Sequence, residues 1–266
     1  MIKGLYTAHT GMVNEMQRLY ILTNNLANAD TTAYKKEGTT SRTFADELAI
    51  KIKDTSHYGL PQKLGEISLV THLGQVYTDY STGNFEVTDN ETDFALEGEG
   101  FFVVAFTDKN GNTSAKLTRD GNFVVDNQGY LRTKDGDYVL NATGALNMNT
   151  DPANYVRVNT LEPFVVDQLG YVYQSDQLIG TMGVVDVENY DYLEKYGENM
   201  YNLVEGGVIT ASEARVHQAT LESSNVNVVD EMVNMIAIQR AYDAGQRVIR
   251  SIDETLGTTV NLGKIK

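Results

Sequence analysis

Two glutamates near the middle of the chain have the spacing best suited to acid–base chemistry. Glu97 and Glu99 are two positions apart, so on a β-strand their carboxylates would share one face. Pairs of acidic side chains flank the scissile bond in most glycoside hydrolases. In a chain with this many acidic residues, however, a solvated surface is the commoner role of such a pair. A glycan-cleaving enzyme is therefore the weaker alternative, and we expect no enzymatic activity.

The other residue types that support catalysis or ligand binding are not arranged for it. The chain has no cysteine, which excludes disulfides and thiolate metal sites. No His-x-x-x-His or Glu-x-x-His spacing occurs among the histidines, which are His9, His57, His72 and His217. Gly98-Glu99-Gly100 is only part of a dinucleotide fingerprint, and a strand-like run follows it. We interpret these glycines as a kink or bulge and expect no cofactor and no metal.

The charge of the chain restricts its partners. Its formal net charge is −15, and the acidic residues are spread along the sequence. Phosphate backbones and anionic lipid would repel such a surface, so we expect no nucleic acid and no membrane insertion. The longest apolar run, Phe101–Phe106, is too short to cross a bilayer. No basic segment followed by an apolar stretch opens the chain, so we expect no Sec-type signal peptide.

The N-terminal segment is predicted to be a helix with a heptad seam. Its seam positions step by four and three residues, and they are Leu5, His9, Met12, Met16, Leu19, Thr23 and Leu26. The helix should end near Asn28, where capping and turn-forming residues begin. Asn24, Asn25 and Asn28 have two interpretations. They cap a frayed helix end, or they bind backbone or neighbouring subunits in a fixed register.

The C-terminal stretch is predicted to be the longest helix. From Val226 to about Leu256 it holds no proline and one glycine, Gly245. Asn227 is placed to cap it, with Asp230 near the positive end of the helix dipole. Its apolar stripe is rich in alanine and lies nearer an eleven-residue repeat than a heptad. The stripe consists of Val226, Val229, Val233, Ala237, Ala241, Ala244, Val248, Ile252 and Leu256, and we expect Met232, Met235 and Ile236 to pack as well.

The middle of the chain changes from an irregular pattern to a period of two. Residues from Glu37 to Val70 are predicted to be a connector with little structure of its own, or with structure that forms only against neighbouring elements. Within it, a short amphipathic helix is possible over Thr43–Ile52, and a turn is predicted at Tyr58–Pro61. From about Gly74 to Ala214, strand-like runs alternate with Asn-Gly and Asp-Gly turns, which predicts a β-meander. The predicted strands are Phe101–Phe106, Lys116–Thr118, Phe123–Val125, Tyr130–Arg132, Tyr138–Leu140, Tyr155–Val158, Phe164–Val166, Tyr171–Tyr173 and Gly180–Val187.

The predicted fold class is therefore α+β. Long terminal helices pair as a coiled-coil-like module, and a central all-β domain, a meander or barrel-like, lies between them. The predicted bounds are 1–36 for the N-terminal helix, 37–73 for the connector, 74–216 for the β domain and 217–266 for the C-terminal helix and tail. Pairing the two helices closes a loop of about 190 residues, and isolated helices are marginal in water. We therefore expect largely disordered ends in a dilute monomer, which order on self-assembly.

Three regions of the chain resemble the flagellar rod and hook proteins. The N-terminal signature of that family is similar to residues 24–36, which read NNLANADTTAYKK. Its C-terminal counterpart is similar to residues 221–229 and 232–242. Internal motifs match at Ser81–Phe85, Gly98–Phe102 and Thr118–Phe123, so that the resemblance covers nearly the whole chain.

The resemblance implies a non-enzymatic structural subunit of the flagellar axial structure. Terminal helices would pack as concentric coiled coils around a central channel, with the β domain outside them. The partners implied are other copies of the chain, other rod and hook proteins, and the flagellar type III export apparatus. The implied location is the basal body, across the periplasm and cell wall, reached without a cleaved signal. Proximal rod subunits are shorter and hook subunits carry large β insertions, so the chain resembles the distal rod protein or its close paralogue. A hook-type subunit and a secreted β-domain adhesin with a helical stalk are the alternatives.

Two further expectations concern particular positions. The family commonly has glycine where Ala33 stands, so a positive φ there would strain Ala33 by roughly 1 kcal/mol. The expected assembly interface consists of the N-terminal seam, the three asparagines named above, Ile236, and the C-terminal stripe from Val226 to Ile252. Within it, we expect the apolar N-terminal seam residues to face Val229, Val233, Ala237, Ala241, Ala244 and Val248 of the C-terminal helix.

Overall fold

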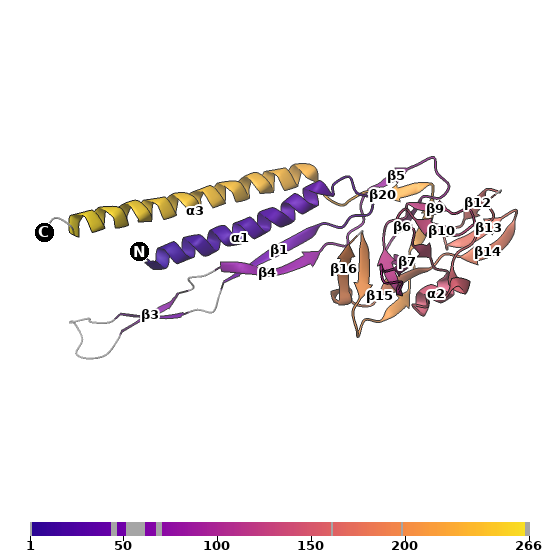
Figure 1. Cartoon of the computed structure of the whole chain (residues 1–266), viewed down its shortest axis with the longest axis horizontal. Coiled ribbons are helices and arrows are strands. Elements are labelled where there is room, and N and C mark those ends of the chain that lie inside the picture. The colour runs from indigo at the N-terminus through magenta and orange to yellow at the C-terminus, as the bar shows by residue number, and fades with distance from the viewer. Residues whose placement is uncertain are drawn as a thin grey trace. The chain divides into compact units, whose positions relative to one another are not determined.

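A long helix stands at each end of the chain and strands fill the sequence between them (Figure 1). The computed structural model describes residues 2–43, 47–51, 62–67, 71–160, 162–197 and 199–263. Two compact units are present. The helical unit comprises Met1–Ala27, Lys36–Asp79 and Val226–Lys266, and the β unit comprises Asn28–Lys35 and Tyr80–Asn225. The chain is therefore α+β as predicted, and part of the region predicted as β domain from residue 74 lies in the helical unit.

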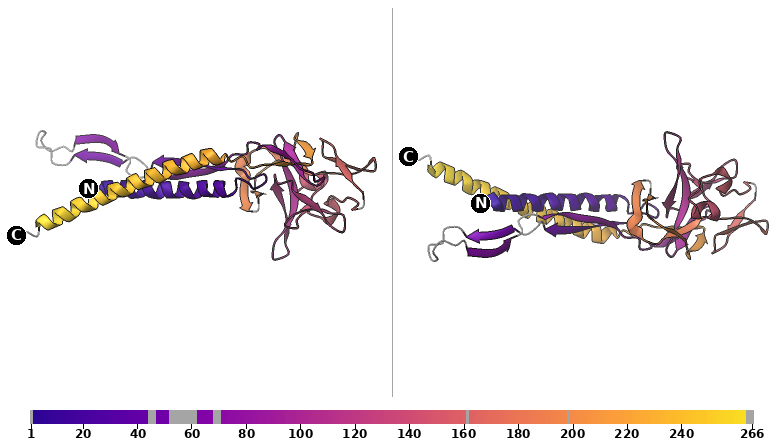
Figure 2. Two further views of the ribbon diagram at one scale, coloured as in Figure 1. Left: turned by 90° about the horizontal axis from the view of Figure 1, so that it is seen from above. Right: turned by 90° about the horizontal axis from the view of Figure 1, so that it is seen from below.

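The helical unit is built around α1, Ile2–Ala27. The helix ends one residue before Asn28, as the turn-forming residues there predicted. On one side α1 packs against α3, Val228–Gly263, and on another it packs against a two-stranded ribbon (Figures 1 and 2). The ribbon pairs β1, Glu37–Thr43, with β4, Thr71–Thr78, in antiparallel register. A second ribbon pairs β2, Glu47–Lys51, with β3, Gln62–Ile67. The α3 cap is as predicted, because the Asn227 side chain accepts hydrogen bonds from the backbone of Val229 at 3.0 Å and Asp230 at 3.4 Å.

One prediction for the connector is wrong: residues 47–51 form β2 where a short helix was predicted. Residues 37–43 and 71–78 are strands that pair with each other. A spacing of four apolar residues over one or two turns does not distinguish helix from strand. The β-branched residues of β1, Thr39, Thr40 and Thr43, favour extended backbone, and their partners lie about 30 residues away in sequence. The turn predicted at 58–61 falls outside the described residues.

The β unit contains a nine-stranded sheet among its described residues. Its main order is β16-β17-β8-β7-β11-β10-β9, with β15 pairing with both β7 and β18. The bounds are β7 Phe101–Thr107, β8 Thr113–Thr118, β9 Phe123–Val125, β10 Leu131–Thr133, β11 Tyr138–Val139, β15 Val184–Val187, β16 Leu193–Gly197, β17 Met200–Leu203 and β18 Ile209–Ala211. The end strands β16 and β9 do not pair with each other, so the described strands do not close the predicted barrel.

Smaller elements complete the β unit. A three-stranded sheet holds β12 Phe164–Val166, β13 Tyr171–Gln174 and β14 Gln177–Thr181, and two pairs join β6 Phe94–Glu97 with β19 Arg215–Gln218 and β5 Phe85–Val87 with β20 Thr220–Glu222. The helical elements are α2 Ala142–Leu146 and the 3₁₀ turns Pro152–Asn154 and Tyr190–Tyr192. Two predicted strands differ from the structure. Residues 155–158 form only isolated bridges, and 180–187 is divided between β14 and β15 at Gly183, where a Cβ would stand 2.6 Å from Leu140 O.

Strand β7 lies at the centre of the core. Phe102 and Val104 join one buried cluster, while Phe101, Val103 and Ala105 join a second cluster on the other face. Burial on both faces explains why this strand is continuously apolar and does not alternate. Gly98 (φ +114°) and Gly100 (φ +149°) make the predicted kink before the strand.

Candidate assembly surface

The face of α3 that meets α1 is a regular heptad stripe. Its buried and half-buried positions step by four and three residues, and they are Glu231, Met235, Ile238, Tyr242, Gly245, Ile249, Ile252 and Leu256. Two close contacts fix the alignment of the helices. A Cβ at Gly245 would stand 2.6 Å from Met12 Cγ, and a Cβ at Gly4 would stand 3.7 Å from Ile252 Cδ1. The first turn of α1 therefore lies beside Ile252 of α3.

The predicted pairing face of α3 is wrong for most of its length. Val229 is 67% exposed, Val233 59% and Val248 49%, and Ala237, Ala241 and Ala244 are exposed as well. Only the last two positions of the predicted stripe, Ile252 and Leu256, are half-buried. The reason is that Met, Ile and Tyr side chains remove more apolar area from water than Ala does, so the stripe with larger side chains faces α1. Val226 precedes the helix and is half-buried.

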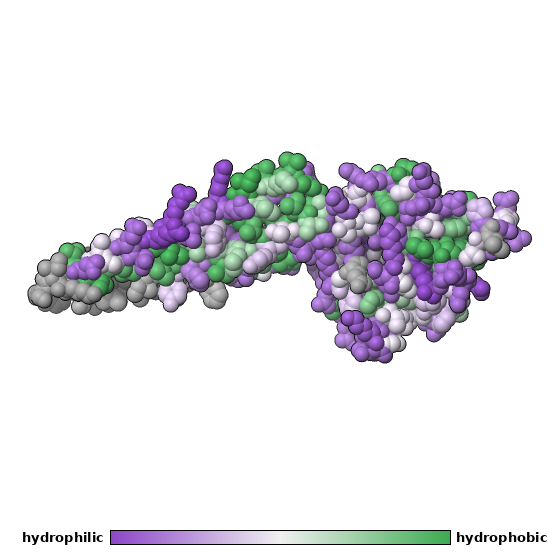
Figure 3. Space-filling model, turned by 45° about the horizontal axis from the view of Figure 1, so that its top comes forward, coloured by the Kyte–Doolittle hydropathy of each residue, from purple (hydrophilic) through white to green (hydrophobic). Residues whose placement is uncertain are grey.

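The first half of α3 consequently exposes an apolar surface. We call Val229, Met232, Val233 and Ile236 the α3 patch; each is 48% exposed or more. In Figure 3 hydrophobic residues gather over the first turns of α3, whereas hydrophilic residues cover much of its second half. Arg240, Asp243 and Arg247 begin that charged half, and all three are exposed. Contiguous exposed apolar surface of this kind marks an interaction site in soluble proteins.

The predicted α1 residues divide between two environments. Leu5, Met12, Leu19 and Leu26 are half-buried, whereas His9, Met16 and Thr23 are exposed. Beside α3, the side chains of Met16, Leu19 and Tyr20 line a groove of about 410 Å³ together with Ile238 and Tyr242. Tyr20 is 65% exposed and Met16 is 38% exposed. The α1 surface is therefore partly covered by α3 and partly open.

The asparagines of α1 have separate roles. Buried Asn25 binds the backbone of Glu37 twice: its Nδ2 donates to Glu37 O at 2.9 Å, and its Oδ1 accepts from Glu37 N at 3.0 Å. Asn25 therefore fixes the register of the first residue of β1, which supports the backbone-binding interpretation. Asn28 follows the helix and accepts hydrogen bonds from Thr31. This contact is a local cap at the helix end, which is the other interpretation. Asn24 is exposed.

Buried Asn14 was not predicted. Its Nδ2 donates to Ser41 Oγ at 3.1 Å and so binds the second half of β1. The signal that could have identified it is its position eleven residues before Asn25, three helical turns earlier on the same face of α1.

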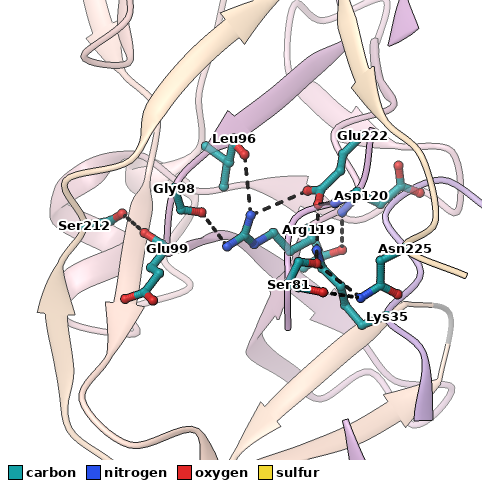
Figure 4. Close-up of polar contacts among 12 residues, drawn as sticks. Lys35, Ser81, Leu96, Gly98, Glu99, Arg119, Asp120, Ser212, Glu222 and Asn225 are labelled. Carbon is teal, nitrogen blue, oxygen red and sulfur yellow. Dashed lines mark hydrogen bonds and ion pairs between the residues drawn. The ribbon is translucent and has the colours of Figure 1, made fainter. Parts of the chain in front are cut away.

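A cluster of buried charges lies inside the β unit (Figure 4). Lys35 Nζ stands 2.6 Å from Glu222 Oε1, and Arg119 Nη1 stands 3.5 Å from Glu222 Oε2. The Gly83 backbone donates to the same Oε1 at 2.8 Å. Each of the three charged side chains is at most 3% exposed. We call Lys35, Arg119 and Glu222 the charged cluster; it holds two cations against one carboxylate.

Backbone contacts surround the charged cluster. Lys35 Nζ also donates to Ser81 O at 2.8 Å, and Arg119 Nη2 donates to Gly98 O at 2.7 Å. Asn225 Nδ2 donates to Ser81 O at 3.2 Å (Figure 4). The residues come from five of the six family-like segments, all except 232–242, and these segments lie far apart in sequence. No local pattern in the sequence indicates that these motifs meet, and Lys35, Arg119 and Glu222 were missed as a site.

Ala33 has the positive φ that was considered because the family commonly has glycine at this position. Its φ is +54° and its side chain is 2% exposed. Its N–H donates to Glu222 O at 2.7 Å, so the left-handed turn directs this segment toward the charged cluster. A conformation that glycine adopts freely is here adopted by alanine.

The two glutamates considered for catalysis do not share a face. Glu97 ends β6, and its carboxylate binds His217 Nε2 at 2.8 Å, a hydrogen bond that holds the pKa of Glu97 below its usual range. Glu99 lies in the turn that follows, where its backbone carbonyl accepts from Ser212. Within the described residues, no three acidic or histidine side chains gather as a metal site. In the same part of the chain, no helix is long and apolar enough to cross a membrane.

Comparison with known proteins identifies the family. Family models match at three places: "Flagella basal body rod protein" at residues 5–35, "Flagellar hook protein FlgE/F/G D1 domain" at 95–175 and "Flagellar basal body rod FlgEFG protein C-terminal" at 217–262. The flagellar basal-body rod protein FlgG of Bacillus subtilis is 31% identical, over 98% of this chain and 99% of its own length. The chain belongs to the flagellar basal-body rod protein family. The rod protein FlgF of Caulobacter vibrioides is 30% identical, over the full length of both chains.

The regions of this rod-family chain that match the family models correspond to elements of the structure. The N-terminal model spans most of α1 and continues to Lys35, the first member of the charged cluster. The C-terminal model begins at His217 in β19 and covers nearly all of α3, so it includes Glu222 and the α3 patch. The family resemblance therefore includes both helices and the charged cluster.

Proposed function

We propose that this rod-family protein polymerises helically into the distal rod of the flagellar basal body. In that role it is a mechanical part: a tube that transmits torque from motor to hook and encloses the export channel. The observation that carries the proposal is the α3 patch. Its four apolar side chains stay at least 48% exposed after α3 has packed against α1, and a helical polymer is the arrangement that covers them in every subunit.

The length of the chain supports a rod position over a hook position. Alignments with FlgG and FlgF rod proteins extend over 98% of this chain or more, which leaves no room for a large additional β insertion. The hook-type alternative requires such an insertion. The adhesin alternative uses the helices only as a stalk, and it gives no role to apolar side chains on the outer face of α3.

The remaining features of the proposal follow from the same family role. The partners are further copies of this chain, other rod and hook proteins, and the flagellar type III export apparatus. The location is the basal body outside the cytoplasm, reached without a cleaved signal, and the protein has no enzymatic activity. The predicted interface residues of both helices, including exposed Ala241, Ala244 and Val248, serve contacts between copies.

Charge on the α3 patch tests the proposal. Val233→Glu together with Ile236→Glu should abolish polymer formation and motility, because each carboxylate would be buried against an apolar neighbour. Ser251→Glu is the matched control, since it lies on the same side of α3 in the charged half, where a carboxylate stays in water. Assembly is measured by sedimentation and by motility in a strain that lacks the native protein. Normal motility of the double variant would refute the proposal.

A second variant tests for close approach of another helix. Ala241→Leu with Ala244→Leu enlarges two exposed positions on α3 without touching its α1-facing stripe. If another copy packs closely there, overfilling should abolish assembly while the β unit stays folded. An adhesin would retain receptor binding when both helices are deleted, whereas a rod subunit would lose its assembly function.

A further inference from the structure

The last turns of α3 extend beyond α1. Ile252 lies beside Gly4 near the start of α1, and α3 continues from there to Gly263 (Figures 1 and 2). We call Thr255–Gly263 the α3 overhang. Val260 is 56% exposed and Leu262 is 72% exposed, and nothing lies within 4 Å of a Cβ built at Gly257. Beyond half-buried Leu256, these positions of the overhang are therefore open with respect to the described residues of the same chain.

The overhang continues the stripe that packs against α1. Leu256 and Val260 follow Ile252 at intervals of four residues, so they lie on the same side of α3 as the established α1 contact. In one chain the start of α1 lies beside Ile252, and Val260, two turns further along the stripe, is 56% exposed. An apolar helix face that continues an existing helix–helix interface is best covered by another apolar helix surface.

A cover of that kind is present at the other end of the helix pair. The groove between α1 and α3 is lined by apolar surface of Met16, Leu19 and Tyr20 from α1 and of Ile238 and Tyr242 from α3. It lies about 18 residues before Val260 along α3, or roughly 27 Å at 1.5 Å per residue. The overhang of one chain therefore cannot reach the groove of the same chain.

The charges favour this match over other occupants. Two acidic residues, Glu15 and Asp243, line the groove; Glu15 pairs with Arg18 at 3.0 Å, and the whole chain carries a net charge of −15, so a groove occupant with acidic residues would be repelled. Residues 255–263, TLGTTVNLG, contain no charged side chain. Gly257 adds a position without a side chain next to Val260 on the helix surface, which allows close approach.

We propose that the α3 overhang of one copy inserts into the α1–α3 groove of the next copy. This inference rests on the proposed function and names the contact that would join successive subunits. The joint is heterologous, because different surfaces of the two copies meet. A heterologous contact that does not close into a ring generates an open helical filament. Successive copies would be displaced along α3 by roughly 27 Å, the separation of the two surfaces.

Engineered cysteines test the joint directly, because the native chain contains no cysteine. One variant carries Tyr20→Cys in the groove, and a second carries Val260→Cys in the overhang. After the two variants are mixed, assembled and mildly oxidised, we expect a disulfide-linked pair on a non-reducing gel. Arg250→Cys replaces Val260→Cys as the control: Arg250 is exposed on α3 but lies outside both the overhang and the predicted interface. No cross-link above the control in assembled material would overturn the proposal.

Charge substitutions give an independent measurement. Val260→Glu would bring a carboxylate near the acidic side chains of the groove and should raise the critical concentration for assembly at least tenfold. Val260→Lys should be tolerated better, because its ammonium group can reach Glu15 or Asp243 of the next copy. Thr258→Glu is the matched control, because Thr258 is exposed and lies two residues from Val260, on nearly the opposite side of the helix. Equal effects of the three substitutions would contradict the proposed joint.

The two proposals fail in different ways. If wild-type chains sediment as polymers but the Tyr20→Cys and Val260→Cys variants do not cross-link, the groove contact is wrong and polymerisation stands. The second failure concerns polymerisation itself. If wild-type chains form no polymer under conditions in which a known rod protein does polymerise, the proposed function fails.

Discussion

Gly245 of α3 lies directly against Met12 of α1, with only 2.6 Å between the position of a Cβ on Gly245 and Met12 Cγ. This is the closest of the described glycine contacts between the two helices. Since α3 has no other glycine before Gly257, the absence of a side chain at this point allows the helices to approach. The contact also sets the axial alignment, because Met12 fits beside α3 only at that position.

Substitution of Gly245 should therefore separate the helices. Gly245→Leu should lower the unfolding free energy of the helical unit by about 1–3 kcal/mol relative to Gly257→Leu, because overfilled contacts are strained by that amount. The comparison is matched, since both changes gain the same helix propensity and nothing lies near Gly257. Helical circular dichroism followed through urea denaturation measures the difference. Adding Met12→Ala to Gly245→Leu should recover part of the loss, and no recovery would contradict the assigned contact.

The charged cluster predicts an order of effects among its own members. Glu222→Ala removes the carboxylate that pairs with both Lys35 and Arg119 and should destabilise the β unit by about 3–5 kcal/mol. Lys35→Met removes one of two cations, leaves one ion pair, and should be clearly milder. The chain has no tryptophan and 11 of its 16 tyrosines lie in the β unit, so tyrosine fluorescence during urea unfolding reports mainly on that unit. The assignment is wrong if Lys35→Met destabilises as much as Glu222→Ala.

Asp120 predicts a pH dependence. Burial raises the pKa of its carboxyl, although hydrogen bonds from the Asn122 backbone at 3.1 Å and from Thr32 Oγ1 at 3.0 Å partly oppose the shift. A folded-state pKa above the unfolded one means that the stability contribution of this group is complete below about pH 4. It is lost as pH rises through the folded-state pKa.

Asp120→Asn isolates that effect, because an amide oxygen can accept the same two hydrogen bonds. The variant should gain stability relative to the native chain as pH increases from about 4 to 7. The measurement is the difference in unfolding free energy between the two proteins across that range. A difference that is constant with pH, or that shrinks as pH rises, would exclude the assigned shift.

The ends of the chain should be the least stable parts of a dilute monomer. We expect limited proteolysis at high dilution to remove α1 and α3 first and to leave a resistant fragment within residues 80–225. In assembled material both helices should become protected. The control is the Val233→Glu, Ile236→Glu variant, whose helices should stay sensitive at every concentration. Helices that resist cleavage in dilute native monomer would refute the expectation.

Features that depend on neighbouring residues could be predicted from the sequence. The end of α1, the Asn227 cap and the hairpin-forming turns follow from local backbone preferences. Ala33 is a similar case, because the requirement for positive φ belongs to its turn. These predictions agree with the structure.

Features that depend on distant residues could not be predicted. The β1–β4 ribbon pairs residues that lie from 28 positions (Thr43 and Thr71) to 41 positions (Glu37 and Thr78) apart, so its hydrogen bonds have no local signal. The α1-facing side of α3 was missed because Tyr242 and Gly245 do not count as apolar in a hydrophobic pattern, although both lie in the interface. The charged cluster joins Lys35 to Glu222 across 187 positions, and charged residues are normally expected at the surface.

The separation of Lys35 and Glu222 in the sequence links the folding of the β unit to the presence of its last residues. Lys35 and Arg119 occur early in the sequence, but the carboxylate that neutralises them is at position 222. A product that stops before residue 222 lacks this carboxylate. We therefore expect a chain truncated before Glu222 to fold less stably than one that also carries the sequence leading into α3.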